Sequence, residues 1–155
     1  QIILDALLQS NCQAHATLVD LSTDAFEYGR ALAESCGMAD RMRYIQGDVR
    51  DVAKTLTERV DVVKMLGICE YLGDQQVTDI ARCAATIMPA GTAMVFNSLS
   101  RTHGNDRFLR RVFGLHMTYR SPDQIRELMA AAGFGQFVTI PEPLGVYHVI
   151  VGRRL

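Results

Sequence analysis

The chain alternates short apolar runs with segments in which apolar residues recur every three or four positions. Apolar runs predict buried strands, and the three-to-four spacing predicts amphipathic helices. Strands are predicted at residues 15–20, 42–46, 60–66, 92–97, 136–140 and 146–152. Helices are predicted at residues 1–11, between Ser22 and Gly37, at 51–58, between Asp74 and Pro89, at 106–115, and between Ser121 and Gly133. This alternation indicates a mainly parallel sheet covered on both faces.

The end of the chain departs from simple alternation. The last two predicted strands are separated only by residues 141–145, which is too short for a parallel crossover, so they should pair antiparallel. We expect all six strands in one sheet, with only the last running against the others. Ser121 to Gln124 form a capping box with proline at the first helical position, which makes the helix that follows the most definite one.

Three predicted strands end at a carboxylate or a glycine. The first ends at Asp20, the second leads into Gly47 and Asp48, and the third is followed by Gly67. In open α/β sheets, ligands bind beyond the carboxyl ends of the strands. A carboxylate there can accept hydrogen bonds from two ribose hydroxyls. The residues alone leave open whether Asp20 only caps the next helix and Asp48 only occupies a surface turn.

Length and composition narrow the class of protein. The 155 residues, 48% of them hydrophobic, predict a single globular domain over residues 1–155. No apolar run is long enough to span a bilayer. The four cysteines have no paired spacing, which favours a reduced, cytoplasmic setting. Cys12 and His15 lack a second ligand pair, so no metal site is predicted.

Charge is distributed unevenly along the chain. Residues 1–100 carry a net charge of −5 and residues 101–155 a net charge of +4. No basic stripe with interleaved aromatic residues is present, so nucleic-acid binding is not expected. A group of arginines could face an anionic substrate, although a solvated helix face is the favoured interpretation; the group comprises Arg101, Arg107, Arg110, Arg111 and Arg120.

Four short stretches, in this order and spacing, resemble the class I S-adenosylmethionine-dependent methyltransferases. They are Leu18-Val19-Asp20-Leu21-Ser22, Ile45-Gln46-Gly47-Asp48-Val49, Val60-Asp61-Val62-Val63 leading to Gly67-Ile68-Cys69-Glu70-Tyr71-Leu72, and Met88-Pro89-Ala90-Gly91-Thr92 followed later by Ala131-Ala132-Gly133-Phe134. The resemblance covers nearly the whole chain. It implies a Rossmann-like, doubly wound α/β/α sandwich with a mainly parallel sheet and an antiparallel last strand.

One departure from the family matters. The family opens with a strand and a glycine-rich turn beneath the methionine part of the cofactor, and this sequence begins in the helix that should follow them. We therefore expect an upstream segment or domain in the natural protein. Without the first strand, the sheet would be left as two half-sheets with exposed edges.

The resemblance assigns cofactor contacts residue by residue. Asp20 should hold the ribose hydroxyls of S-adenosylmethionine, and Asp48 should accept a hydrogen bond from the adenine amino group. Leu21 and Val49 should pack on the two faces of the adenine. Gly67 would let the backbone approach the cofactor closely.

The resemblance also implies methyl transfer of the EC 2.1.1 type to an acceptor near the third strand end. The catalytic candidates are His103, Glu70 and Tyr71, and the substrate-contact candidates are His116, Tyr119, Arg107 and Arg111. Simpler explanations stay open: His103 as a solvated loop histidine, His116 as a packed one, and Tyr71 as helix-face packing. The Asn/Asp-Pro-Pro-aromatic signature of amide and base methylation is absent, which favours a small-molecule acceptor.

Residues 98–119 are longer than a plain doubly wound fold needs between a strand and a helix. Long connections in compact domains are often functional lids. The helix predicted within this segment has an apolar face that should dock on the body. We expect the segment to border the same cleft as Asp20 and Glu70.

Two other functions fit the same fold. One is transfer of another group from a related nucleoside cofactor, such as aminopropyl transfer, against which the basic residues 101–126 argue. The other is a non-catalytic binding domain that has lost the cofactor. The missing glycine-rich turn keeps the second alternative open.

Overall fold

The computed structural model describes residue 9, residues 13–101 and residues 105–155. The chain divides into two compact units, Gln1–Thr55 and Leu56–Leu155, which we describe one at a time. The helix predicted at residues 1–11 lies outside the described residues, apart from Gln9.

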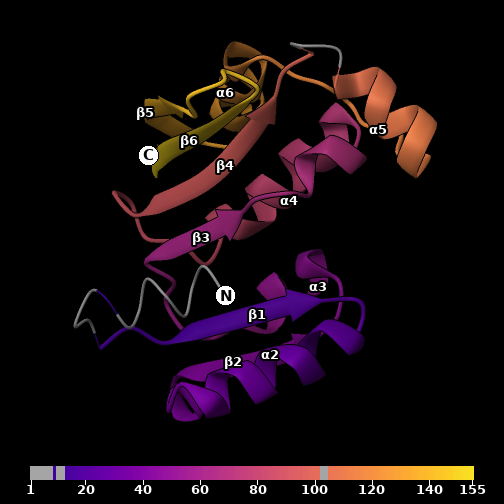
Figure 1. Cartoon of the computed structure of the whole chain (residues 1–155). Coiled ribbons are helices and arrows are strands. Elements are labelled where there is room, and N and C mark those ends of the chain that lie inside the picture. Colours follow the sequence, from indigo (N-terminus) through magenta and orange to yellow (C-terminus); the bar gives the residue numbers. More distant parts are fainter. Residues whose placement is uncertain (1–8, 10–12, 102–104) are drawn as a thin grey trace. The chain divides into compact units, whose positions relative to one another are not determined.

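The first unit is built on two parallel strands (Figure 1). Strand β1, Ala16–Asp20, pairs with β2, Met42–Gln46, in a register that sets Asp20 opposite Gln46. Helix α2, Asp24–Ser35, and a 3-10 turn, Ala39–Arg41, connect the strands, and helix α3, Val49–Thr55, follows β2. The order agrees with the predicted alternation of strands and helices.

The helices of the first unit bury one apolar stripe each. Phe26 and Ala33 of α2 are buried, and the Phe26 ring lies 5.4 Å from the Tyr44 ring of β2. Val52 and Ala53 of α3 are buried too. The apolar spacing seen in the sequence therefore fixes which helix faces meet the sheet.

The ends of these helices differ slightly from the prediction. The N-cap of α2 is Thr23, one residue later than predicted, and Ser22 Oγ accepts a hydrogen bond from the Asp24 amide. Helix α3 begins at Val49, two residues earlier than predicted, because the Asp48 carboxylate accepts the Arg50 amide at 2.8 Å. A side-chain acceptor ahead of a helix satisfies one of its free first-turn amides.

The second unit contains a four-stranded sheet in the order β3-β4-β6-β5. Its strands are β3 Val62–Met65, β4 Ala93–Leu99, β5 Phe134–Pro141 and β6 Tyr147–Arg154. β4 pairs parallel with β3 and antiparallel with β6, and β6 pairs antiparallel with β5. Within this sheet β6 runs antiparallel to both of its neighbours, β4 and β5, which confirms the antiparallel ending.

The helices of the second unit are α4 Asp74–Ala85, α5 Asn105–Phe113 and α6 Pro122–Ala131, with a 3-10 turn, η2, at Cys69–Tyr71. Helices α4 and α6 lie on the same face of the sheet (Figure 1). On this side Phe96, Ile150 and Met94 are fully buried, and Phe96 meets Phe134 edge to face at 6.0 Å between ring centroids.

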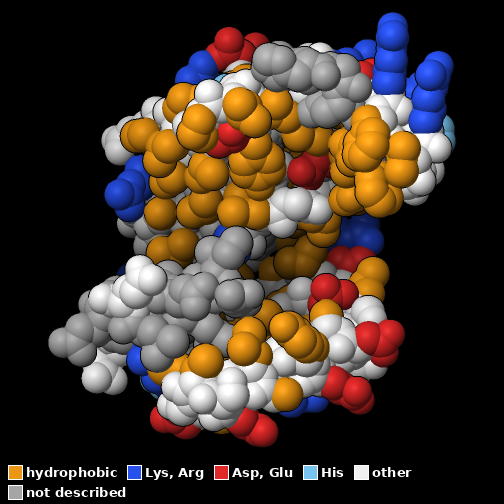
Figure 2. All heavy atoms as spheres, in the orientation of Figure 1, with side chains coloured by type: hydrophobic (Ala, Val, Ile, Leu, Met, Phe, Trp, Pro, Cys, Tyr) orange, Lys and Arg blue, Asp and Glu red, His pale blue; other side chains and the backbone are white. Residues whose placement is uncertain are grey.

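The opposite face of the sheet is also apolar. Because side chains alternate along a strand, Val138 and Ile140 of β5 and Val62 of β3 point away from α4 and α6. Each is more than half exposed. Figure 2 shows hydrophobic side chains gathered over the strands of the second unit.

The predicted single sheet is wrong for the described residues. Their strands form a two-stranded sheet, β1-β2, and a separate four-stranded sheet. The physical reason is that β1 pairs only with β2 and β3 only with β4, so no strand joins the two groups.

The predicted docking of the helix within residues 98–119 is also wrong for most of its apolar face. Phe108, Val112 and Phe113 of α5 are each more than half exposed. Phe108 and Phe113 stack edge to face on one another, with ring centroids 5.6 Å apart. The two phenyl rings thus shelter each other instead of inserting into the core.

The capping box predicted at the start of α6 is confirmed. Ser121 Oγ accepts a hydrogen bond from the Gln124 amide at 3.2 Å, and Gln124 Oε1 accepts one from the Ser121 amide at 2.9 Å. At the other end Gly133 has a φ of +92°, which favours glycine after the last turn.

Replacing Ser121 with alanine should lower the free energy of unfolding by about 1 kcal/mol, because the Gln124 amide loses its acceptor. Urea unfolding followed by circular dichroism measures the change. Glu127→Ala, at an exposed position of the same helix, is the control and should change it by less than about 0.5 kcal/mol. Equal effects of the two substitutions would contradict the capping role.

Candidate functional site

Two acidic residues lie at neighbouring strand ends of the first unit. Asp20 ends β1, and Asp48 comes two residues after the end of the parallel partner β2. The Gly47 amide donates to the Asp20 carbonyl at 2.9 Å, which ties the two ends together. The predicted proximity of Asp20 and Asp48 at adjacent strand ends is therefore confirmed.

The Asp20 carboxylate is exposed and only partly occupied. Its Oδ1 atom accepts the Ser22 amide at 2.9 Å, which fixes the orientation of the side chain. No hydrogen bond to Oδ2 is found among the described residues. A carboxylate held by one oxygen, with the other facing solvent, can accept hydrogen bonds from a ligand.

The Asp48 carboxylate is engaged by Arg50. Arg50 Nε donates to Oδ1 at 2.9 Å, and Arg50 Nη2 forms an ion pair with Oδ2. These side-chain bonds, and then the Arg50 amide, hold the pKa of Asp48 well below the usual range for aspartate. A ligand that uses Asp48 must share the carboxylate with Arg50 or displace it.

Apolar side chains accompany the two acids. Leu21, directly after Asp20, is 70% exposed, and its carbonyl accepts the Gln46 side-chain amide at 3.2 Å. Val49, directly after Asp48, is half-buried at the start of α3. An exposed leucine beside a carboxylate offers an apolar surface on which a planar ring can pack.

In the second unit, a buried amide connects the ends of β3 and β4. Asn97 of β4 is fully buried. Its Oδ1 atom accepts the Gly67 amide at 2.8 Å, and its Nδ2 atom donates to Glu70 Oε1 at 2.7 Å. Gly67 has a φ of +76°, a conformation that favours glycine and turns the chain sharply after β3.

Glu70 is 6% exposed, and its second oxygen, Oε2, is buried without a hydrogen-bond partner among the residues that the structure describes. An unpaired buried carboxylate oxygen is costly, because it loses its contact with water without a replacement. Such an atom is a natural place for a ligand to donate a hydrogen bond.

Two further titratable side chains border Glu70. Burial, followed by the charge of Glu70, raises the pKa of Tyr147 on β6. Burial also raises the pKa of the Cys69 thiol to about 12, so this cysteine stays a neutral thiol. The Cys69 thiol and the Tyr147 hydroxyl near Glu70 therefore both keep their protons at neutral pH.

Arg120 fixes the turn that carries Glu70. The guanidinium is buried, donates to the carbonyls of Cys69 at 2.6 Å and Leu72 at 2.7 Å, and pairs with Asp74 at 2.7 Å. Its own amide bonds to the Leu99 carbonyl. Arg120 is thus a buried clamp on this turn. The prediction that grouped Arg120 with solvated or substrate-facing arginines is wrong for this residue.

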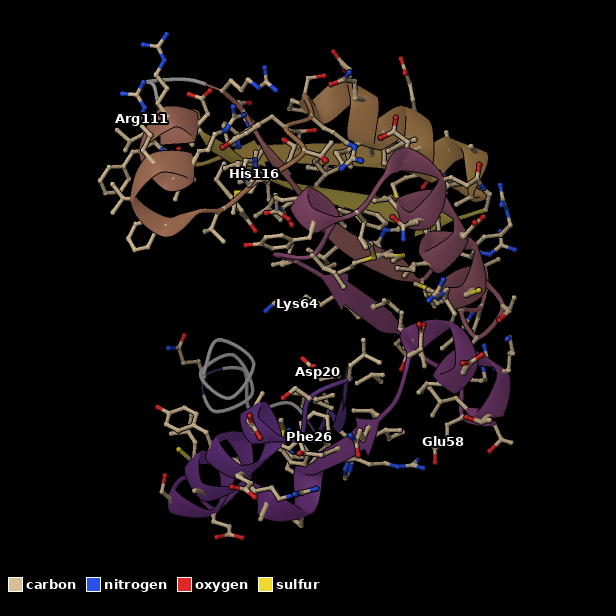
Figure 3. All side chains as sticks on the ribbon, turned by 90° about the vertical axis from the view of Figure 1, so that its right-hand side faces the viewer. Asp20, Phe26, Glu58, Lys64, Arg111 and His116 are labelled. Carbon is tan, nitrogen blue, oxygen red and sulfur yellow. The ribbon has the colours of Figure 1, made fainter. Side chains whose placement is uncertain are left out.

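The other predicted substrate residues lie on α5 or in the connection that follows it. Arg107 and Arg111 are exposed, and Figure 3 shows Arg111 pointing outward from α5. His116 is exposed in the connection (Figure 3), and Tyr119 lies under the Arg101 guanidinium at 5.2 Å. His103 lies outside the described residues.

The connection after α5 does reach the turn of Glu70. The Thr118 amide donates to the Glu70 carbonyl at 2.7 Å. Tyr71, next to Glu70, is 54% exposed and so is not held by helix-face packing. The structure therefore brings the end of this connection, at Thr118, beside Glu70.

Sequence reasoning missed Asn97 and Tyr147. Asn97 stands inside an apolar strand where a polar residue is unusual, and this could have identified it. Tyr147 carries no such signal, because its proximity to Glu70 depends on the pairing of β4 with β6.

Across residues 13–101 and 105–155, no cluster of three or more His, Cys, Asp or Glu side chains could hold a metal ion. No helix in the described part of the chain is long and apolar enough to cross a membrane.

A family model described as "Putative methyltransferase" matches residues 1–154. The chain belongs to the S-adenosylmethionine-dependent methyltransferase family. No curated protein matches the sequence.

Solved structures of methyltransferases share the fold. They include N,N-8-amino-8-demethyl-D-riboflavin dimethyltransferase from Streptomyces davawensis (19% identity, TM-score 0.79, 99% of this chain and 46% of that one). An O-methyltransferase family 2 protein from Planctomyces limnophilus in complex with apigenin has 16% identity, a TM-score of 0.78, and coverage of 99% and 47%. An O-methyltransferase family protein from Burkholderia thailandensis has 16% identity, a TM-score of 0.77, and coverage of 98% and 47%.

These similarities show the fold of this methyltransferase. The predicted Rossmann-like α/β class, with parallel and antiparallel strands, is confirmed. The chain spans about half the length of the structures it matches.

The Arg50 contacts of Asp48 lead to a pH prediction. Because the folded-state pKa is lowered, ionised Asp48 favours the folded turn above the unfolded pKa, and this contribution is lost as the pH falls through the folded value. Arg50→Gln should raise the pKa of Asp48 toward the ordinary range, as measured by carbon NMR of the carboxyl group. Lys54→Gln, which removes only a weaker charge effect, should change it little. An unchanged pKa in Arg50→Gln would contradict the assignment.

Proposed function

We propose that this protein transfers a methyl group from S-adenosylmethionine to a small-molecule acceptor. The observation that carries the proposal is the pair of carboxylates, Asp20 and Asp48, at the adjoining carboxyl ends of parallel strands in a chain of the methyltransferase family. This is the edge at which open α/β sheets bind nucleotides.

The first unit fits the nucleoside part of the cofactor. Asp20 accepts the ribose hydroxyls, for which one carboxylate oxygen faces solvent while the other is fixed by Ser22. Leu21 and Val49 pack on the adenine, and Asp48 accepts from its amino group by sharing the carboxylate with Arg50. Gly67, which belongs to the second unit, is the further residue that we propose for a close backbone approach to the cofactor. When bound, the cofactor supplies an already activated methyl group, which is the difficult part of the chemistry.

The second unit supplies the acceptor side. Glu70 Oε2, buried and unpaired, accepts a hydrogen bond from the hydroxyl or amine of the acceptor and takes its proton as the nucleophile forms. Tyr71 follows Glu70 in the chain, and Tyr147 borders Glu70 from β6. Both tyrosines help to hold the acceptor. Alignment of this kind can contribute about 7–11 kcal/mol to lowering a barrier.

Residues 98–119 form the wall or lid of the acceptor site. The Thr118–Glu70 hydrogen bond supports this role for the end of the segment. His103, His116 and Tyr119 contact the acceptor, and Arg107 and Arg111 favour an acceptor with negative charge. Among the similar structures, one is the dimethyltransferase of a riboflavin derivative and another is in complex with apigenin, which supports a small-molecule acceptor.

We place the protein in the cytoplasm. Of the four cysteines, the three that the structure describes, Cys36, Cys69 and Cys83, are free thiols. Free, partly buried thiols are typical of a reducing compartment.

Calorimetric titration with S-adenosylmethionine, followed by a methyl-transfer assay over a panel of hydroxylated and amino metabolites, tests the function. Binding together with formation of S-adenosylhomocysteine is the expected result. Binding without any transfer would favour another nucleoside-cofactor reaction. No binding would favour a non-catalytic domain and overturn the proposal.

Asp20→Ala should weaken S-adenosylmethionine binding by roughly 2 kcal/mol, about thirtyfold, because hydrogen bonds to a charged group are lost. The titration above measures it. Asp40→Ala removes an exposed aspartate just before the opposite end of β2 and should leave the affinity unchanged. Equal affinities of the two variants would remove Asp20 from the site.

Glu70→Gln should lower kcat by about 100-fold or more, because the amide cannot take a proton. The amide oxygen can still accept the hydrogen bond from Asn97, so the fold and the cofactor affinity should be kept. Steady-state kinetics measure the change, with Glu127→Gln on the exposed face of α6 as the control. A kcat equal to that of the control would show that Glu70 does not act as the base.

A further inference from the structure

The carboxylate of Glu70 is held from one side only. Asn97 Nδ2 donates to Oε1 at 2.7 Å, whereas Oε2 has no hydrogen-bond partner within residues 13–101 and 105–155. A carboxylate can rotate about its last bond, and a single directed hydrogen bond to one oxygen decides where the other oxygen points.

Asn97 is itself fixed. Its Oδ1 atom accepts the Gly67 amide at 2.8 Å, so the amide plane cannot turn without losing a buried bond at each end. The side chain is fully buried, and its strand lies between β3 and β6. The rigid centre of the sheet therefore sets the position of a carboxylate on a short irregular turn.

Both ends of this network bear on the site. Gly67 is the proposed point of close approach to the cofactor, and Glu70 is the proposed base. The Asn97 side chain thus bonds both to the Gly67 amide, on the proposed cofactor side, and to the Glu70 carboxylate, on the proposed acceptor side.

We propose that Asn97 is a positioning residue that aims Glu70 Oε2 at the methyl acceptor and couples it to the backbone at Gly67. This inference rests on the proposed methyl transfer. Asn97 does not contact the reacting atoms; it acts through Glu70 and Gly67.

The neighbouring titratable groups matter for the test, because they could respond to pH as well. Cys69 lies on the same turn, and Tyr147 faces Glu70 from β6. Arg120 donates to the Cys69 carbonyl of the turn and pairs with Asp74. The raised pKa values of Cys69 and Tyr147 keep both neutral between pH 6 and about 9, the range that the test would use.

Asn97→Ala removes the bond and should lower kcat by about 10- to 100-fold at every pH, with S-adenosylmethionine affinity changed by less than about twofold. Ser98→Ala is the matched control, because Ser98 is the next residue on the strand, is equally buried, points to the other face and has an unpartnered hydroxyl. It should match the wild-type kcat.

Asn97→Asp replaces the amide donor with a second carboxyl group. Two adjacent buried carboxyl groups hold one proton between them, and that proton can take the place of the amide hydrogen. The kcat of Asn97→Asp relative to wild type should therefore fall as the pH rises and the shared proton is lost. A merely structural contribution of Asn97 would not give this pH dependence.

The double variant Glu70→Gln with Asn97→Asp exchanges the carboxylate and the amide. It separates the effect of the carboxylate's position on kcat from an effect on the stability of the fold. It restores a carboxylate–amide hydrogen bond, so thermal unfolding should return close to wild type. The carboxylate now lies at the wrong position, so kcat should stay as low as in Glu70→Gln.

An exchange variant with wild-type kcat, or an Asn97→Ala kcat equal to that of Ser98→Ala, would overturn the positioning role while methyl transfer stands. A wild-type protein that binds no S-adenosylmethionine or transfers no methyl group would overturn the proposed function, and this inference with it.

Discussion

The requirement that buried polar groups find partners determines the second unit. Asn97 lies in the middle of an apolar sheet, and it satisfies both ends of its amide with Gly67 and Glu70. Arg120 does the same on the other side of the turn, where its buried guanidinium meets two carbonyls and Asp74. Breaking either contact would leave buried donors or acceptors unpaired, which costs far more than the bonds add to stability. The turn at Cys69–Tyr71 is therefore defined by side chains at distant positions.

The first unit depends on a different constraint. Parallel pairing of β1 with β2 places their carboxyl ends side by side, so the acids that follow the strands become neighbours without any direct bond between them. Local hydrogen bonds then orient each carboxylate, from Ser22 to Asp20 and from Arg50 to Asp48. The site for a nucleoside is built from backbone topology first and side-chain contacts second.

The two units divide the proposed chemistry. The first offers an exposed carboxylate, Asp20, a half-buried one, Asp48, and an exposed leucine, which suit a polar, planar ligand bound from solvent. The second offers a buried carboxylate with one unpaired oxygen, which suits proton transfer in a site shielded from water. Apolar residues on α5 and on the sheet face opposite α4 and α6 are exposed, so part of the apolar pattern of the chain lies outside its core. Large exposed apolar surfaces of this kind commonly mark interaction sites.

The sequence by itself determined the local elements. Apolar spacing placed the six strands, and the capping box at Ser121 placed the start of α6, because these features depend on residues close together in the chain. It also identified Asp20 and Asp48, since a carboxylate directly after a strand is visible in one dimension. Only the tertiary structure decided that Asn97 meets Glu70, that Tyr147 borders them, that Arg120 is a buried clamp, and that the strands form two sheets. These depend on which strand edges pair and on contacts between residues 27 to 51 positions apart, and no local pattern encodes such contacts.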